Sequence, residues 1–124
     1  MAKALGIGGV FFKARDPAAL AAWYGAHLGI DVQDGFAGAI FTADAVPAGG
    51  YTVWSPFAAD TTYFDPSAAP YMINLMVDDL DGALAQVAEG GATLVGTPED
   101  SEYGRFGWFV DPEGNKIELW QPPG

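Results

Sequence analysis

The sequence contains one pattern twice, and this repeat constrains the fold more than any other feature. Residues 10–16 (VFFKARD) align with residues 73–79 (INLMVDD), and residues 52–56 (TVWSP) align with residues 118–122 (ELWQP). Each half has strand-like segments around one helix-like segment, in the order βαβββ. Two such units in one short chain cannot each bury a sheet face alone, so we expect them to pack together around a shared concavity.

In the first half, Asp16 and Pro17 start a helix, because Asp is a preferred N-cap and Pro suits the first helical position. The helix runs to residue 27 or 28, and Gly29 closes it as a C-cap. The strands expected in this half are residues 6–14, 30–32, 39–42 and 51–54.

In the second half, Asp79 caps the helix, and Gly90 with Gly91 ends it. Residues 111–115 (DPEGN) have the composition of a tight turn, so the chain closes on a hairpin. Alternation along its last strand places Lys116, Glu118 and Trp120 on one face. The strands expected in this half are residues 71–77, 93–95, 106–110 and 116–120.

The bulk composition excludes several functions. The formal charge is −11, with only five Lys and Arg, which argues against binding to nucleic acid or to anionic membranes. Cysteine is absent, so there is no disulfide and no thiolate site. The sequence has no targeting signal and no membrane-length apolar run, and we expect a cytoplasmic protein. We expect one domain, residues 1–124, with module one at 1–56, a linker at 57–70 and module two at 71–124.

The ordered motifs resemble the vicinal oxygen chelate superfamily, which includes glyoxalase I, extradiol dioxygenases and bleomycin resistance proteins. The resemblance covers nearly the whole chain and rests on residues 10–16, 21–24, 28–30, 77–81, 90–92 and 109–119. It implies an α+β fold of two βαβββ modules curled into a half-barrel sheet around a cleft. It also implies a homodimer.

Metal-using members of the superfamily hold a divalent ion with up to four residues on these strands. The matching positions here are Gly9, Thr52, Met72 and Glu118. Gly9 has no side chain, Met72 is a soft thioether and Thr52 is a weak neutral ligand, so only Glu118 fits. One carboxylate does not hold such an ion, because catalytic sites need about three protein ligands. We therefore predict no metal and no other cofactor.

Strand parity predicts an aromatic cleft, the usual composition of a small-molecule site. Trp54 and Trp120 occupy equivalent positions in the two modules and suit a planar or cationic ligand. For Phe11 and Met72, filling a core is the competing interpretation. The predicted ligand-binding residues are Phe11, Thr52, Trp54, Met72, Asn74, Arg105, Trp108 and Trp120.

Glu118 has three interpretations. It is a hydrogen-bonded framework residue, a ligand-binding residue, or a catalytic general base. If it is buried it needs a partner, and Arg105, Lys13 and Tyr103 are candidates. The single histidine, His27, belongs at a helix end on the outer layer, away from the cleft.

Three functions remain open. The first is a metal-independent binding protein of the bleomycin-resistance type that takes a small aromatic or cationic molecule. The second is a glyoxalase-like lyase or isomerase that uses Glu118 as base or metal ligand. The third is a dimeric scaffold with a filled cleft.

Overall fold

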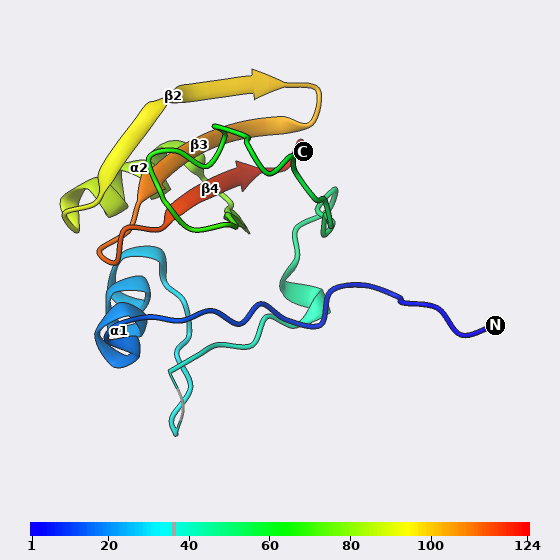
Figure 1. Cartoon of the computed structure of the whole chain (residues 1–124), viewed down its shortest axis with the longest axis horizontal. Helices are drawn as coiled ribbons and strands as arrows, with labels where there is room; N and C mark the ends of the chain where they lie inside the picture. The colour runs from blue at the N-terminus through cyan, green and yellow to red at the C-terminus, as the bar shows by residue number, and fades with distance from the viewer. Residues whose placement is uncertain (36) are drawn as a thin grey trace.

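The computed structural model describes residues 1–35 and 37–124. The main elements are two helices, α1 (Pro17–Leu28) and α2 (Leu80–Glu89), a 3-10 turn η1 (Ala43–Ala45), and four strands. The strands are β1 (Ile73–Met76), β2 (Thr93–Ser101), β3 (Gly104–Val110) and β4 (Lys116–Gln121). They form one open sheet in the order β1-β4-β3-β2 (Figure 1). The predicted α+β class with a curled, unclosed sheet is confirmed.

The second half forms the βαβββ unit that its sequence predicts. β1 pairs with β4 in parallel, while β3 pairs antiparallel with both β4 and β2. The turn between β3 and β4 is held by Asp111, whose Oδ1 accepts hydrogen bonds from the backbone N–H groups of Glu113 and Asn115, both at 2.9 Å. Gly114 has φ +86°, which a residue with a side chain rarely adopts. The closing hairpin is therefore set by its turn residues.

Both helices begin and end where the sequence predicts. The Asp16 side chain accepts from the N–H of Ala19, and that of Asp79 accepts from the N–H of Gly82. Gly29, with φ 64°, ends α1 in the left-handed conformation. Local capping chemistry alone thus fixes these boundaries.

The core lies between the helices and one face of the sheet. Phe109, Leu119, Leu80 and Val87 are almost fully buried there. Gly107 lies beneath α2, where an added Cβ would come within 2.9 Å of Leu84. The opposite face of the sheet is free of helices, and we call it the open face. It carries the other side chains of β3 and β4.

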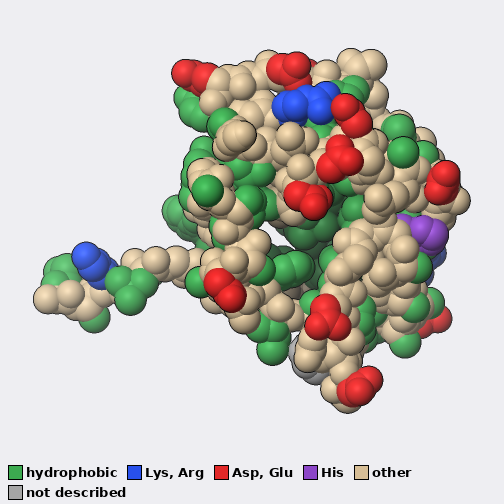
Figure 2. Space-filling model, turned by 180° about the vertical axis from the view of Figure 1, so that it is seen from behind, with side chains coloured by type: hydrophobic (Ala, Val, Ile, Leu, Met, Phe, Trp, Pro, Cys, Tyr) green, Lys and Arg blue, Asp and Glu red, His purple; other side chains and the backbone are tan. Residues whose placement is uncertain are grey.

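The strands predicted in the first half are wrong: residues 6–14, 30–32, 39–42 and 51–54 form no strand in the described chain. The N-terminal segment runs past α1 and below the sheet in Figure 1, and its far end stands clear of the rest (Figures 1 and 2). A strand exists only where a neighbour bonds its backbone N–H and C=O groups. These segments meet no such neighbour. The Gln33 N–H to Gly38 carbonyl bond, at 2.8 Å, joins the two sides of one turn in this half.

No helix in the described chain is long and apolar enough to span a membrane.

Candidate ligand site on the open face of the sheet

The register of the sheet places Glu118 between two hydrogen-bond donors. Glu118 on β4 lies opposite Asn74 on β1 and opposite Trp108 on β3. Paired residues in a sheet point to the same face, so all three side chains lie on the open face. Asn74 Nδ2 donates to Glu118 Oε1 at 2.8 Å, and Trp108 Nε1 donates to Oε2 at 2.9 Å. Two strand pairings therefore determine both contacts.

A third donor comes from the linker, residues 57–70, which passes over β3 and β4 (Figure 1). The Tyr63 hydroxyl donates to Glu118 Oε2 at 2.5 Å. Burial, together with the hydrogen bond to Glu118, raises the pKa of Tyr63 above its usual range, so the phenol keeps its proton at neutral pH. Glu118 thus accepts three hydrogen bonds from protein groups, which leaves little of the acceptor capacity of a carboxylate free.

Lys116 joins the same group of side chains. It is buried, lies two residues before Glu118 on β4, and shares the open face. Its Nζ donates to the Tyr63 carbonyl at 2.6 Å and lies 5.1 Å from the centre of the Tyr63 ring and 5.9 Å from the Trp108 ring. The attraction between the ammonium and the two rings, together with packing of the lysine methylene groups, stabilises the contact of Lys116 with Tyr63 and Trp108.

Aromatic rings line the remainder of the open face. Trp120 is 4 % exposed, stacks on Phe106 and meets Tyr51 edge-on at 4.9 Å between ring centres. Its Nε1 donates to the Tyr103 carbonyl at 2.7 Å. Beyond Trp108, the rings of Tyr63 and Phe57 stack at 5.7 Å. The face therefore has aromatic walls around the Glu118 carboxylate and the Lys116 ammonium, and Glu99 on β2, which pairs with Phe106, adds a second carboxylate to it.

The predicted site residues divide by their place in the chain. Asn74, Trp108, Glu118 and Trp120 share the open face, and Met72 is half-buried just before β1. The first-half residues Phe11, Thr52 and Trp54 are exposed, the first of them at 97 %. The strands predicted to carry them to the cleft are not formed, and in the described residues none of the three hydrogen-bonds to Glu118 or packs a ring on Trp108 or Trp120.

Arg105 lies on the other face of the sheet. Its guanidinium donates to both carboxylate oxygens of Asp81 on α2 at 3.1 Å, and to Asp100 at 2.9 Å. Neither Arg105 nor the other suggested partners, Lys13 and Tyr103, bonds to Glu118 in the described residues. The linker aromatics, Tyr63 among them, suit closure of the cleft, but neither Tyr63 as the partner of Glu118 nor Lys116 as a member of the site is among the sequence-based predictions. The parity of β4 places Lys116 on this face and was the available signal, whereas nothing local fixes where the linker lies.

The residues do not suit the divalent ion that the superfamily implies. Across residues 1–35 and 37–124, no three His, Asp or Glu side chains are grouped closely enough to hold a metal. Glu118 bonds to three protein donors, and Gly9 and Thr52 lie in segments outside the sheet.

Comparisons with known proteins agree with the fold. A family model described as a glyoxalase-like domain matches residues 9–120. The chain belongs to this family. The resemblance to the vicinal oxygen chelate superfamily is thereby confirmed. No curated protein matches the chain significantly.

Solved structures similar to this glyoxalase-like chain fall into two groups. An antibiotic binding protein from Streptomyces sp. CB03234 is 39 % identical over 41 % of each chain, with a TM-score of 0.37. A member of the glyoxalase/bleomycin resistance protein/dioxygenase superfamily from Sphaerobacter thermophilus DSM 20745 is 38 % identical over 40 % of each chain, with a TM-score of 0.36. The match thus spans about two-fifths of the length of these relatives.

A longer but more distant match is a protein from Agrobacterium tumefaciens solved by solution NMR. It is 19 % identical, covers 90 % of this chain and 92 % of its own, and has a TM-score of 0.52. At this identity the match supports the fold alone.

Proposed function

We propose that this glyoxalase-like protein binds a small aromatic or cationic molecule on the open face of the sheet, without a metal. The observation that carries the proposal is the set of bonds around Glu118. Tyr63, Asn74 and Trp108 donate to its two oxygens, so the carboxylate is held by the protein rather than directed at an ion. The surrounding aromatic walls suit a flat ligand, and the net charge of −11 favours a neutral or cationic one.

Tryptophan fluorescence tests the binding. Trp108 and Trp120 both lie on the open face, so a ligand placed there changes their emission. A panel of flat aromatic and cationic compounds is titrated into wild-type protein in the presence of a chelator. We expect saturable quenching that is lost in Trp108→Ala and retained in Trp54→Phe, a control in the exposed first half. No saturable response to any compound contradicts the proposal.

A glyoxalase-like lyase or isomerase is the second candidate. Its support is the position of Glu118 on the last strand, where metal-using members of the superfamily carry a ligand. This candidate requires Glu118 to accept a proton or a metal in addition to its three protein donors. Stoichiometric binding of nickel, zinc or manganese that Glu118→Gln abolishes establishes it and contradicts the metal-independent proposal.

We also propose that the protein acts as a homodimer. The first half exposes apolar side chains that a monomer leaves in water, among them Phe11 at 97 % and Trp54 at 78 %. The outer edge of β1 has no neighbouring strand in the sheet and offers a place for pairing. Because of the internal repeat, the first-half segments of one copy resemble the second-half segments that form strands in another copy.

Sedimentation tests the dimer. We expect wild-type protein to sediment as a dimer and Phe11→Asp as a monomer. Leu5→Asp changes an equally exposed apolar residue outside the repeated segments, and we expect it to remain dimeric. A wild-type monomer at every accessible concentration contradicts this proposal.

A further inference from the structure

The Tyr63 side chain lies on the open face in the way that a bound ligand would. Its hydroxyl donates to Glu118, its ring meets the Trp108 ring edge-on at 6.4 Å, and the Phe57 ring stacks on it. Lys116 Nζ lies over its ring at 5.1 Å. A carboxylate acceptor, a cation over the ring and aromatic walls together recognise a phenol.

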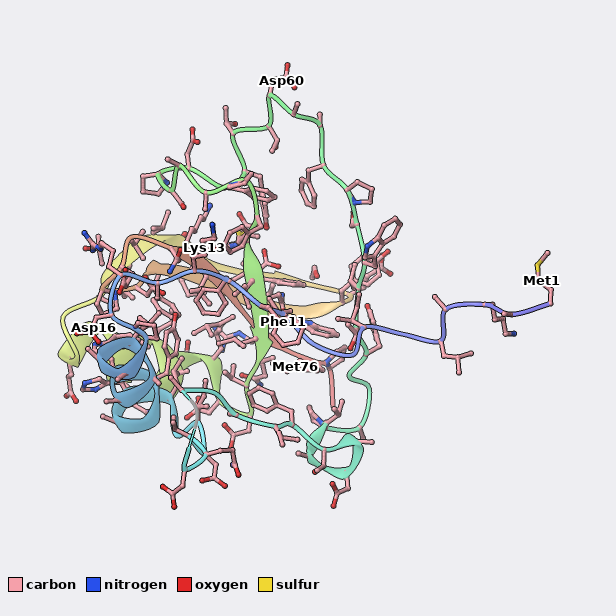
Figure 3. All side chains as sticks on the ribbon, turned by 60° about the horizontal axis from the view of Figure 1, so that its bottom comes forward. Met1, Phe11, Lys13, Asp16, Asp60 and Met76 are labelled. Carbon is pink, nitrogen blue, oxygen red and sulfur yellow. The ribbon has the colours of Figure 1, made fainter. Side chains whose placement is uncertain are left out.

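The groups that hold this phenol belong mainly to the sheet, whereas the phenol itself belongs to the linker. Trp108 lies on β3, and Lys116 and Glu118 lie on β4. Linker residues 57–70 form neither helix nor strand, and the hydrogen bonds within the linker close local turns. Asp60 lies at the outer tip of this loop (Figure 3). The binding groups are therefore built independently of the segment that occupies them.

One residue anchors the linker to the open face. In the described chain, both hydrogen bonds between the linker and the sheet involve Tyr63, one through its hydroxyl and one through its carbonyl. Of the linker residues around it, Thr62 and Asp65 are exposed, whereas Phe64 is half-buried and its ring packs on those of Phe57 and Tyr63. Release of Tyr63 thus breaks no strand pairing. It leaves Glu118 with a free acceptor position and Lys116 with a free donor.

We propose that the side chains of Trp108, Lys116 and Glu118 form a binding site for planar phenols, which the protein's own Tyr63 occupies in the absence of ligand. The inference rests on the proposed function and names the ligand class for that site. A phenolic ligand donates its hydroxyl to Glu118 and places its ring where the Tyr63 ring lies. Tyr63 competes as a tethered ligand, so the apparent affinity for a free phenol falls with the fraction of sites that Tyr63 fills.

The test replaces Tyr63 and supplies its side chain from solution. The variant Tyr63→Ala is titrated with p-cresol, which is the tyrosine side chain as a free molecule, and binding is followed by calorimetry and tryptophan fluorescence. We expect Tyr63→Ala to bind p-cresol about tenfold more tightly than wild type, because the tethered competitor is gone. We expect 4-methylanisole, which has the same ring and no O–H donor, to bind much more weakly than p-cresol.

A second variant covers the case in which Tyr63→Ala does not fold. Phe57→Ala removes the exposed ring that stacks on Tyr63 and leaves every hydrogen bond of the site in place. We expect it to increase p-cresol affinity by a smaller factor, because the linker is held less firmly. If folded variants bind p-cresol no better than wild type, or no better than 4-methylanisole, the proposal is overturned.

The outcomes separate this inference from the proposed function. If wild type binds another compound of the ligand panel on the open face while neither variant prefers p-cresol, only the phenol assignment fails. If Tyr63→Ala binds p-cresol and wild type binds nothing in the panel, the phenol site stands and the proposed function of the wild-type protein fails.

Discussion

The two halves of this chain have the same sequence pattern, yet within residues 1–35 and 37–124 only the second half forms a sheet. Each half contributes one helix with an Asp cap and a glycine end. In the second half the segments around the helix pair as β1 to β4, whereas the matching segments of the first half form no strand in the described residues and expose apolar side chains. A helix boundary is therefore set by local residues, whereas a strand requires hydrogen bonds from a neighbouring strand, which its own residues do not supply.

The largest expected effect contrasts Phe109 with Phe11. Phe109 is completely buried between the helices and the sheet, so Phe109→Ala should lower the free energy of unfolding by about 3–5 kcal/mol at every protein concentration. Phe11→Ala should lower it only at concentrations where the dimer forms. Urea unfolding at several concentrations measures both. Equal losses in dilute protein would show that the first half is packed within the monomer.

Asp111 tests how the second half holds the helix of the first half. Its carboxylate accepts from the Tyr24 hydroxyl at 2.9 Å and from the backbone of the β3–β4 turn. Burial and the neighbouring Asp111 raise the pKa of Tyr24, which therefore stays a donor. Asp111→Ala leaves several donors unpaired and should cost about 3 kcal/mol, while Tyr24→Phe removes one bond and should cost about 1 kcal/mol. Thermal unfolding compares them. A Tyr24→Phe loss as large as the Asp111→Ala loss would contradict the assignment of the turn to Asp111.

Trp120 and Trp54 occupy equivalent positions in the repeat and provide a matched pair. Trp120 is buried with its Nε1 bonded to Tyr103, whereas Trp54 is 78 % exposed. In dilute protein, Trp120→Phe should cost about 1–2 kcal/mol and Trp54→Phe less than about 0.5 kcal/mol. Chemical unfolding of both variants checks this. Similar costs would mean that the two halves are built alike.

The smallest effect concerns Glu113, which links the β3–β4 turn to the start of α1. Its carboxylate accepts from the N–H groups of Asp16 and Arg15, and these bonds lower its pKa below the usual range of a glutamate. A carboxylate with a lowered pKa in the folded state stabilises the fold above its unfolded pKa, and this stability is lost as the pH falls. As the pH falls below the ordinary glutamate pKa of about 4.3, wild-type stability should therefore drop more steeply than that of Glu113→Gln. Parallel acid-unfolding curves would show that this link does not form.

Much of the fold is legible in the sequence. Local residues fix where the helices and the closing hairpin begin and end, so both are predicted with nearly correct bounds. These residues are the caps Asp16, Asp79 and Gly29 and the turn at residues 111–115. The first-half strands are predicted from the same kind of alternation, but pairing is a long-range property. Residues 6–14 show this, since their pattern is strand-like and their backbone has no partner in the sheet.

The site residues that lie on the strands can be predicted from the sequence, because strand parity and pairing register place them. Parity along β4 places Glu118 and Trp120 on the open face, and the pairing register adds Asn74 and Trp108. Tyr63 cannot be assigned in this way, because it lies in a linker whose path depends on the finished sheet. The prediction that Arg105 binds ligand in the cleft fails for another reason. It is an odd-numbered residue of β3 and faces α2, where Asp81 pairs with it.

The indole N–H resonance of Trp108 reports whether the open face binds its ligand without a metal. This group donates to Glu118 Oε2, so its NMR resonance reports any change in that carboxylate's partners. The protein is titrated, with chelator present, with the best compound from the fluorescence panel. We expect a saturable shift of this resonance. If the shift is absent until stoichiometric nickel, zinc or manganese is added, the claim of metal-independent binding is contradicted.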